Sequence, residues 1–374
     1  MITRRTLLSL PALSLPSFAA RESLVFVGTY TRGGSKGIYA YRFDHGSGKL
    51  SELGLAAEAA NPSFLAIHPN GRYLYCVNEL SKSPERNEGG VTAFRIDRPA
   101  AKLERLNELP SGGTSPCHLN VDATGRYLLV VNYGNGSTSV FRLKPDGSLA
   151  ERTAVVQHSG SSVNARRQEG PHAHSVNLSK NNRFAIVADL GTDEYIVYRF
   201  DAQAGAITRH GAAKVKPGSG PRHFSFHPTY RYGYGVNEMG SSVSVFRWDE
   251  NAGTLAELQT ISTLPEGFSG INNCAEILVH PSGAFVYASN RGHDSLAVFA
   301  VDQATGRLRN LGHTSTQGKT PRNFRLDPAG EWLLAANQDS GNIVVFRVNR
   351  RAGALSPAGV EVKVPYPVCI RFLV

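Results

Sequence analysis

Short runs in which apolar and polar residues alternate dominate the chain from residue 24 onward. Runs such as "GVTAFRID" (90–97), "SVSVFRWD" (242–249) and "GNIVVFRVN" (341–349) carry Val, Ile and Phe at strand spacing and are bounded by Gly, Asn or Asp. Almost no segment after the N-terminal region shows the 3.6-residue period of a helix. The pattern therefore predicts an all-β protein built from many short strands.

The strand pattern repeats along the chain. The segment "PSFLAIHPNGRYLYCVNE" (62–79) recurs as "PCHLNVDATGRYLLVVNY" (116–133) and "PRHFSFHPTYRYGYGVNE" (221–238), with further copies that start at residues 173, 274 and 321. Each copy is followed by a third strand, a turn and a "G-x-L" step, so one unit holds four strands in 47 to 57 residues. Four short strands at this period are typical of a β-propeller blade.

The two ends of the chain determine the number of blades. Residues 24–44 match the second half of a unit without its first strand, and "PVCIRFLV" (367–374) matches only a first strand. If the C-terminal strand completes blade 1, the ring closes and leaves no exposed sheet edge. We therefore expect one domain over residues 20–374, a seven-bladed β-propeller of four-stranded antiparallel blades.

Length, charge and apolar content exclude several classes of protein. The 374-residue chain has a formal net charge of +10, but its Lys and Arg residues are scattered, and the densest cluster is "NARRQE" (164–169). A nucleic-acid-binding protein would concentrate this charge in a stripe, so we expect no nucleic-acid partner and favour a small anionic molecule, such as a lactone or sugar acid. No apolar stretch of about 18 residues follows the N-terminus, so no membrane association is expected in the mature form. Closed propellers of this kind are expected to be monomers.

The first residues read as an export signal. Residues 1–19 combine the pair Arg4 and Arg5, an apolar run, and small residues before a cleavage position after Ala19. The segment resembles a twin-arginine signal, although a Sec-type signal with a chance Arg pair stays open. Both interpretations place the mature protein in the periplasm or outside the cell. The four cysteines lack paired spacing, and we expect no structural disulfide.

Aligning the repeats, with the start residue counted as step zero, separates structural from variable positions. Step sixteen holds Asn or Asp in all six full copies, which predicts side chains that cap turns. The residues at step one and step seventeen instead change from blade to blade while the strands around them stay alike. The large ionisable residues at these two steps fall in blades 4 to 7, and we expect them to converge on one side of one mouth of the channel: His174, Arg222, Glu238, Arg291 and Arg322.

Other chemistries that the motifs suggest are weaker. "GGSKG" (33–37) matches G-x-S-x-G but lies between two strands, and "GHTSTQGKT" (312–320) has one residue too many for a phosphate-binding loop. The pair His172 and His174 raises the question of a metal site, but it offers only two ligands in a cationic surrounding. We expect no metal and no cofactor.

The expected mouth residues suit an anionic substrate. Arg side chains match carboxylate or phosphate groups and stabilise oxyanion charge, while His174 or Glu238 could transfer a proton. Lactone hydrolysis fits these groups. Our predicted catalytic residues are His174, Glu238, Arg222 and Arg291, and the predicted substrate contacts are Arg322, His172, Asn237, Asn290, Glu79 and Gln338. The long loop "SGSSVNARRQEGP" (159–171) could fold over the mouth as a lid.

Specific motifs extend this picture to a known family. "GPHAHSV" (170–176), "GPRHFSFHP" (220–228), "YGVNE" (234–238) and "SNRGHDS" (289–295) resemble the seven-bladed lactonase family over residues 23–374. This family includes bacterial propeller-type 6-phosphogluconolactonases and fungal carboxy-cis,cis-muconate cyclases. The resemblance implies a metal-independent lactonase whose active-site residues correspond to His174, Arg222, Glu238 and Arg291.

Two points limit what the resemblance implies. Sugar phosphates of the pentose phosphate pathway are cytoplasmic, whereas this chain begins with an export signal, so 6-phosphogluconolactone itself is in doubt as the substrate. The alternatives to hydrolysis are a carboxymuconate-type cycloisomerase and a ligand-binding propeller without catalysis. The sequence also leaves open which of His174 and Glu238 is the base.

Overall fold

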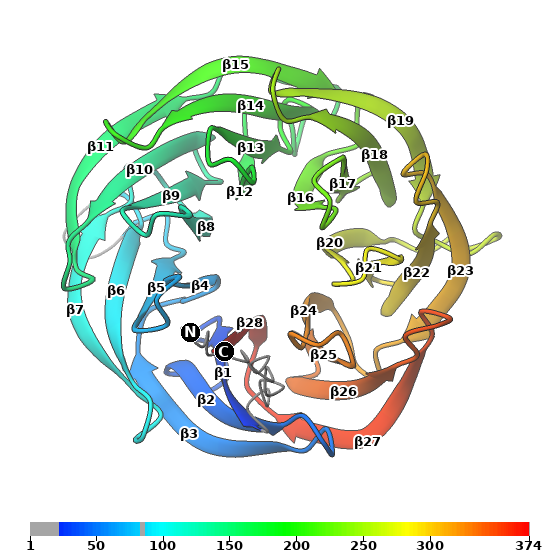
Figure 1. The fold of residues 1–374 in the computed structure, drawn as a ribbon, viewed down its shortest axis with the longest axis horizontal. Helices are drawn as coiled ribbons and strands as arrows, with labels where there is room; N and C mark the ends of the chain where they lie inside the picture. Colours follow the sequence, from blue (N-terminus) through cyan, green and yellow to red (C-terminus); the bar gives the residue numbers. More distant parts are fainter. Residues whose placement is uncertain (1–21, 83–86, 374) are drawn as a thin grey trace, which may run out of the picture.

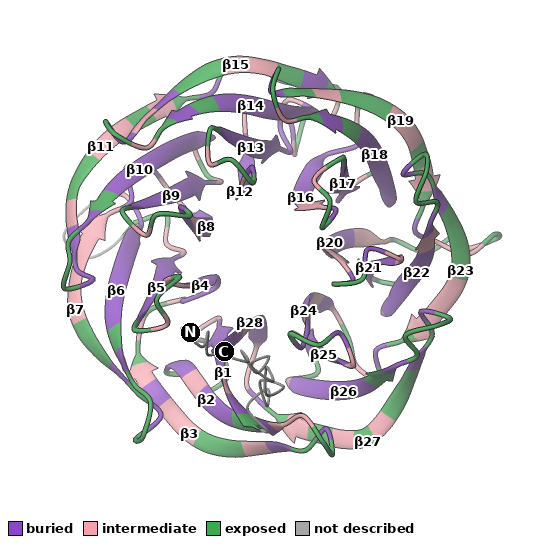
Figure 2. Cartoon of the chain, viewed as in Figure 1, coloured by how far each residue is buried: buried purple, intermediate pink, exposed green. Residues whose placement is uncertain are grey.

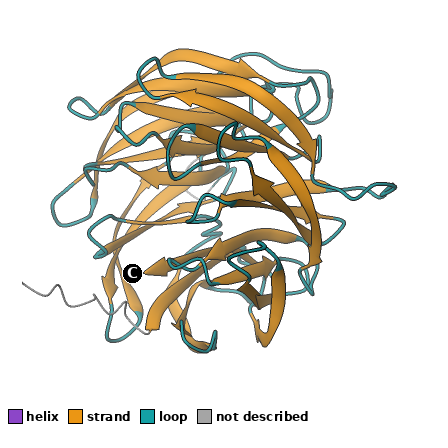
Figure 3. Cartoon of the chain, turned by 45° about the vertical axis from the view of Figure 1, so that its right-hand side comes forward, coloured by secondary structure: helices purple, strands orange, loops and turns teal. Residues whose placement is uncertain are grey.

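Seven four-stranded antiparallel sheets surround a central axis in the computed structural model, which describes residues 22–82 and 87–373 (Figure 1). This arrangement confirms the predicted seven-bladed propeller. Strands and short loops make up the described chain, as Figure 3 shows from a second direction. Within these residues no helix is long and apolar enough to cross a membrane. The predicted export signal, residues 1–19, lies outside the described part of the chain.

The strands of each blade run from the axis to the rim in chain order. The innermost strands are β28 (Pro367–Leu373), β4 (Leu65–Ile67), β8 (Pro116–Val121), β12 (Ala173–Leu178), β16 (Pro221–Phe226), β20 (Asn273–Val279) and β24 (Pro321–Leu326). The second strands are β1 (Glu22–Thr29), β5 (Tyr73–Asn78), β9 (Tyr127–Asn132), β13 (Phe184–Asp189), β17 (Tyr232–Asn237), β21 (Phe285–Arg291) and β25 (Trp332–Asn337).

The outer half of each blade follows the same order. The third strands are β2 (Gly37–Asp44), β6 (Gly90–Asp97), β10 (Ser137–Leu143), β14 (Glu194–Asp201), β18 (Ser242–Asp249), β22 (Ser295–Val301) and β26 (Asn342–Val348). The outermost strands are β3 (Leu50–Glu58), β7 (Lys102–Pro110), β11 (Leu149–Gln157), β15 (Ala206–Lys214), β19 (Thr254–Ser262), β23 (Leu308–Ser315) and β27 (Leu355–Lys363).

The ring closes where the two ends of the chain meet. β28 pairs antiparallel with β1, in a register that places Leu373 opposite Leu24 and Cys369 opposite Gly28. This is the predicted completion of blade 1 by the C-terminal strand. Because pairing satisfies the backbone groups of β1, no strand edge is left open between the first and last blades.

The core lies between neighbouring blades. Clusters of buried apolar side chains combine residues of adjacent sheets, such as Tyr287 of β21 with Phe346 of β26. Burial of the residues decreases toward the rim of the ring. Second strands such as β13 are buried throughout, whereas most residues of outermost strands such as β27 are exposed or half-buried (Figure 2). All four cysteines are buried and free, and they lie in four different blades.

The glycine of the repeated "G-x-L" step is required by the packing of one blade on the next. Gly306 and Gly353 lie in turns before an outermost strand, both with a φ of +73°. A Cβ atom at either position would lie 2.4 Å from an aromatic ring of the preceding blade, Tyr232 for Gly306 and Phe285 for Gly353. Only glycine combines this backbone conformation with such a close approach.

Candidate active site

A β-bulge at the start of the inner strand shapes one mouth of the channel. In several blades the pairing of the inner strand with the second strand skips the residue at step one, for example between Ala173 and Ser175 and between Pro221 and His223. A bulge turns a side chain away from the direction that regular pleating would give it. The skipped residues of five blades line one small cavity at the mouth: Cys117, His174, Arg222, Arg322 and Val368.

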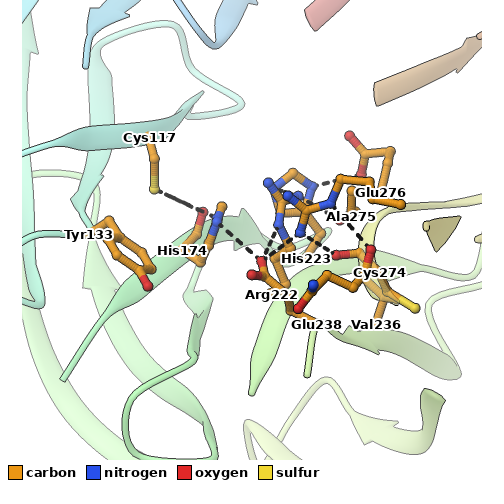
Figure 4. A network of polar contacts seen from close by, with 12 residues as sticks. Cys117, Tyr133, His174, Arg222, His223, Val236, Glu238, Cys274, Ala275 and Glu276 are labelled. Carbon is orange, nitrogen blue, oxygen red and sulfur yellow. Dashed lines mark hydrogen bonds and ion pairs between the residues drawn. The ribbon is translucent and has the colours of Figure 1, made fainter. Parts of the chain in front are cut away.

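Glu238, directly after β17, lies among three guanidinium groups, and Figure 4 shows it beside that of Arg222. Its Oε2 accepts a hydrogen bond from Nε of Arg222 at 2.9 Å and lies 3.0 Å from Nη2 of Arg291. Its Oε1 accepts a hydrogen bond from Nη2 of Arg167 at 2.8 Å. Nε2 of His174 is 4.0 Å from Oε2. The structure therefore brings together the four predicted catalytic residues and adds Arg167.

The surrounding cations keep Glu238 ionised. The residue is only 5% exposed, and burial alone would raise its pKa. The charges of Arg291, Arg222 and Arg167 outweigh burial and hold the pKa of this carboxyl well below its usual range. A carboxylate with so little affinity for a proton is a weak base, but it is a strong anchor for the three guanidinium groups.

His174 is held in the opposite state, as a neutral ring. Burial, followed by the charges of Arg222 and His223, lowers its pKa well below the usual value for histidine. Its Nδ1 lies 3.7 Å from Sγ of Cys117. That thiol is not activated, because burial and the charge of Glu79 raise the pKa of Cys117. At neutral pH the imidazole is therefore unprotonated, so that one ring nitrogen is available as a proton acceptor, although the neighbouring cations make it a weaker base than an ordinary histidine.

A second carboxylate lies elsewhere on the mouth. Glu79, in blade 2, accepts hydrogen bonds from the hydroxyl of Tyr30 at 3.0 Å and from the hydroxyl of Ser63. Arg322 of blade 7 lies over the ring of Tyr30, with 5.3 Å between Cζ and the ring centroid. Within the described chain, the guanidinium of Arg322 forms no direct hydrogen bond or ion pair. The five residues that were predicted to converge belong to the consecutive blades 4 to 7, and Glu79 adds a second carboxylate from blade 2 to the same mouth.

A buried hydrogen-bond chain supports Arg222 from below. Nη1 of Arg222 donates to the carbonyl of Ala275 at 2.6 Å and lies 3.2 Å from Nε2 of His223. Because Arg can only donate, Nε2 of His223 accepts and its Nδ1 carries the proton, which is donated to Glu276 at 2.8 Å. Asn323 donates to the second oxygen of Glu276 at 2.5 Å. These contacts fix the position of the Arg222 side chain.

The other predicted substrate contacts lie apart from this group. His172 stacks on Tyr133, with centroids 4.6 Å apart, and its Nδ1 is 2.9 Å from the carbonyl of Tyr133. Asn237 and Asn290 are fully buried, and their side-chain amides donate to the hydroxyl of Ser242 and to the carbonyl of Thr263, respectively. Gln338 lines a separate surface cavity beside Tyr366. The structure therefore gathers Glu79 and Arg322 at the mouth but not these four residues.

One residue that the sequence analysis did not select, Arg167, belongs to the mouth. Arg167, 40% exposed, comes from the 159–171 loop and also donates to the hydroxyl of Tyr133 at 3.2 Å. The predicted lid loop thus reaches the mouth, where the fully buried Gln168 donates to the carbonyl of Leu190 at 2.9 Å. The unusual density of charge in "NARRQE" was the available signal for Arg167.

The mouth offers proton transfer and anion binding. Among the described residues, no group of three or more His, Cys, Asp and Glu side chains could hold a metal ion. The cavity between Glu79 and His174 measures only about 10 Å³, close to the volume that holds one water molecule. A sugar ring would therefore have to lie on the outer side of the His174 and Arg222 side chains.

Comparisons with known proteins agree over almost the whole chain. The sequence model of the family described as "Lactonase, 7-bladed beta-propeller" matches residues 24–372. A 6-phosphogluconolactonase of Bacillus subtilis is 38% identical over 348 residues, covering 93% of this chain and 97% of that protein.

Two solved structures are similar as well. A Bacteroides fragilis protein proposed to be a 6-phosphogluconolactonase is 36% identical, with a TM-score of 0.88 and coverage of 96% of this chain and 99% of that one. The periplasmic gluconolactonase of Pseudomonas aeruginosa is 35% identical, with a TM-score of 0.87 and coverage of 94% and 99%.

Proposed function

This chain belongs to the lactonase family of seven-bladed β-propellers, and we propose that it hydrolyses a sugar lactone without a metal ion. The observation that carries the proposal is the buried Glu238 carboxylate, which three guanidinium groups surround beside a neutral His174. Carboxylate, imidazole and guanidinium groups at one mouth supply the charges that lactone opening requires. The reaction adds water across the ester bond and yields a hydroxy acid.

His174 is the proposed general base. It removes a proton from water while the water oxygen attacks the lactone carbonyl carbon, and it returns the proton to the ring oxygen as the carbon–oxygen bond breaks. Both oxygens of Glu238 are already engaged by guanidinium groups, which argues against that residue in this role. Glu238 instead holds Arg222, Arg291 and Arg167 in place, so that the like-charged groups can share one small region.

The guanidinium groups stabilise negative charge as it develops. Attack of water places a negative charge on the carbonyl oxygen, and the product is a carboxylate. Arg291 and Arg167 are the more exposed members of the cluster, at 14% and 40% of their side chains, and are therefore the proposed contacts for this charge. Because no carboxylate of residues 22–82 or 87–373 is bonded to Arg322, we assign it to an anionic group of the substrate.

The relatives support a sugar lactone as the substrate class. Their names include 6-phosphogluconolactonase and periplasmic gluconolactonase. The surplus of cations at the mouth favours a substrate with a negative group, and 6-phosphogluconolactone is the first compound to test. The periplasmic relative, together with the export signal expected in residues 1–19, supports a function outside the cytoplasm.

A lactone panel tests the proposal. Purified protein should open 6-phosphogluconolactone or gluconolactone faster than the spontaneous rate, with and without a chelator. His174→Gln should lower kcat/KM by roughly 10²- to 10⁴-fold. Arg291→Gln should remove about 3 kcal/mol of transition-state stabilisation, which also lowers kcat/KM. The matched control is Arg307→Gln, an exposed arginine that does not line the cavity at the mouth, which should leave the rate unchanged.

Several outcomes would contradict the proposal. Wild-type rates in both the His174→Gln and the Arg291→Gln variant would refute the site assignment. Loss of activity in the presence of a chelator would refute the metal-free reaction. Conversion of a muconate to its lactone, without hydrolysis of any sugar lactone, would identify a cycloisomerase instead. Ligand binding without any turnover would leave only a binding propeller.

A further inference from the structure

A second cavity occupies the channel below the mouth. It has a volume of about 420 Å³ and is lined by the inner strands of all seven blades. One of its lining residues, Tyr230, lies in the turn between β16 and β17, which is the end of blade 5 away from Glu238. Phe64 and His223 line both cavities and therefore form the wall between them. The second cavity is thus a separate space that belongs to the opposite side of the ring.

Two guanidinium groups line this second cavity. Arg325 and Arg371 occupy step four of the inner strands β24 and β28, in adjacent blades. Burial, together with the charge of Arg371, lowers the pKa of Arg325 to about 10, so the Arg325 guanidinium remains charged at neutral pH. Placing two cations side by side in a cavity is unfavourable unless an anion lies near them.

The carboxylate nearby does not bond to these cations. Glu276 is the one acidic side chain among the described residues that line the cavity, and its two oxygens accept hydrogen bonds from His223 and Asn323. Within the described chain, the guanidinium of Arg325 forms no hydrogen bond or ion pair. Each guanidinium carries five N–H donors, so donors are available on the cavity side.

The geometry holds one of the two groups in place. Arg371 donates to the carbonyl of Ile370 at 2.7 Å, and its Cζ lies 4.4 Å from the centroid of the Phe64 ring. A guanidinium that is fixed by a ring and a carbonyl is prepared to bind an oxyanion with little loss of entropy. Polar side chains occupy the same step in three other blades: Asn120, Asn177 and Ser225.

We propose that Arg325 and Arg371 form an oxyanion-binding site in the channel, which takes a phosphate or carboxylate group and is distinct from the mouth at Glu238. The fork of each guanidinium matches two oxygens of such a group. The polar side chains across the cavity complete the surroundings of the anion. The site does not depend on the proposed lactonase reaction.

Calorimetric titration with inorganic phosphate and with gluconate, in a buffer without other polyvalent anions, tests this site. The double variant Arg325→Gln/Arg371→Gln should lose the channel site and bind at least about tenfold more weakly, as expected when charged hydrogen bonds are removed. Arg322→Gln at the mouth and the exposed Arg307→Gln should retain the site. Circular dichroism and the melting temperature establish that each variant is folded.

A crystal structure of the wild-type protein with phosphate or gluconate tests the site without any substitution. Density for either anion between Arg325 and Arg371 supports the proposal. Binding that is unchanged in the double variant, binding that is lost only in Arg322→Gln, or anion density at the mouth alone would overturn it. Absence of phosphate and gluconate binding at millimolar concentration would overturn it as well.

Discussion

Glu238 and Glu79 occupy the same repeat position in blades 5 and 2, yet their surroundings differ. Each carboxylate contacts the step-one residue of its own blade, which is Arg222 beside Glu238 and Ser63 beside Glu79. Three guanidinium groups lie against Glu238, whereas the hydroxyls of Tyr30 and Ser63 bond to Glu79. The propeller thus repeats the backbone position, and the neighbouring side chains decide what the carboxylate does.

The difference assigns separate tasks to the two parts of the mouth. The Glu238 part is deeply buried, with His174 and Arg222 only 5% and 2% exposed, and its charges are tied to one another. The Glu79 part contains Arg322, whose guanidinium has no bonded carboxylate among the residues that the structure describes. We therefore expect substitutions around Glu238 to affect the chemical step and the stability, and those around Glu79 to affect substrate binding.

The largest expected effect is a difference in stability between variants of the two carboxylates. Glu238→Gln leaves three guanidinium groups without their anion and should lower the free energy of unfolding by about 3–5 kcal/mol, because an uncompensated buried charge is costly. Glu79→Gln removes only hydrogen bonds to hydroxyls and should cost about 1 kcal/mol. Denaturant unfolding at pH 7 measures both values. Equal losses in the two variants would show that the comparison is wrong.

The second prediction concerns the binding part of the mouth. Arg322→Gln should raise the KM for 6-phosphogluconolactone by about tenfold or more, as expected for the loss of a charged hydrogen bond, and should change kcat less. The KM for uncharged gluconolactone should rise less than this. Steady-state kinetics on the two lactones gives the comparison, and Arg322→Lys should recover part of the affinity. An equal rise in KM for both lactones would contradict the role assigned to Arg322, which is to bind the anionic group of the substrate.

The pH dependence of the reaction sharpens the role of His174. Since its pKa lies well below the usual histidine value, the neutral base persists as the pH falls, and the acid limb of kcat/KM should lie below pH 6.5. Arg322 contributes to this lowering, so Arg322→Gln should move the limb toward neutral pH. Arg307→Gln should leave the limb in place. A limb that moves in the acid direction in Arg322→Gln would contradict this electrostatic account.

The smallest expected effects come from single hydroxyl groups on the two parts of the mouth. Tyr30→Phe removes a donor to Glu79, and Tyr133→Phe removes the acceptor for Arg167. Each should cost about 1 kcal/mol. In Tyr30→Phe this loss should appear mainly in KM, whereas in Tyr133→Phe it should appear in kcat, because Arg167 contacts Glu238. The reverse pattern in steady-state kinetics would contradict the division between the two parts.

Repeat alignment found part of the site for a physical reason. Regular strands impose the same requirements on every blade, so the residues around each inner strand are alike in all repeats. The positions of His174 and Arg222 could be recognised because the residue there changes from blade to blade. Arg167 could not be found in this way, because it lies in a loop outside the repeat, and its contact with Glu238 depends on how that loop packs. The chain from Arg222 through His223 to Glu276 crosses between blades 5 and 6, and nothing local in the sequence connects these residues.

The sequence by itself determined the strand pattern, the seven blades and the closure of the ring by residues 367–374, because these follow from period-two alternation and a repeat of about fifty residues. Only the tertiary structure decided that bulges aim the step-one side chains into the mouth, that Glu238 is an anchor while His174 stays neutral, and that Arg322 is left without a bonded carboxylate. Charge states depend on burial and on neighbours from other blades, and these distances exist only after the ring has closed.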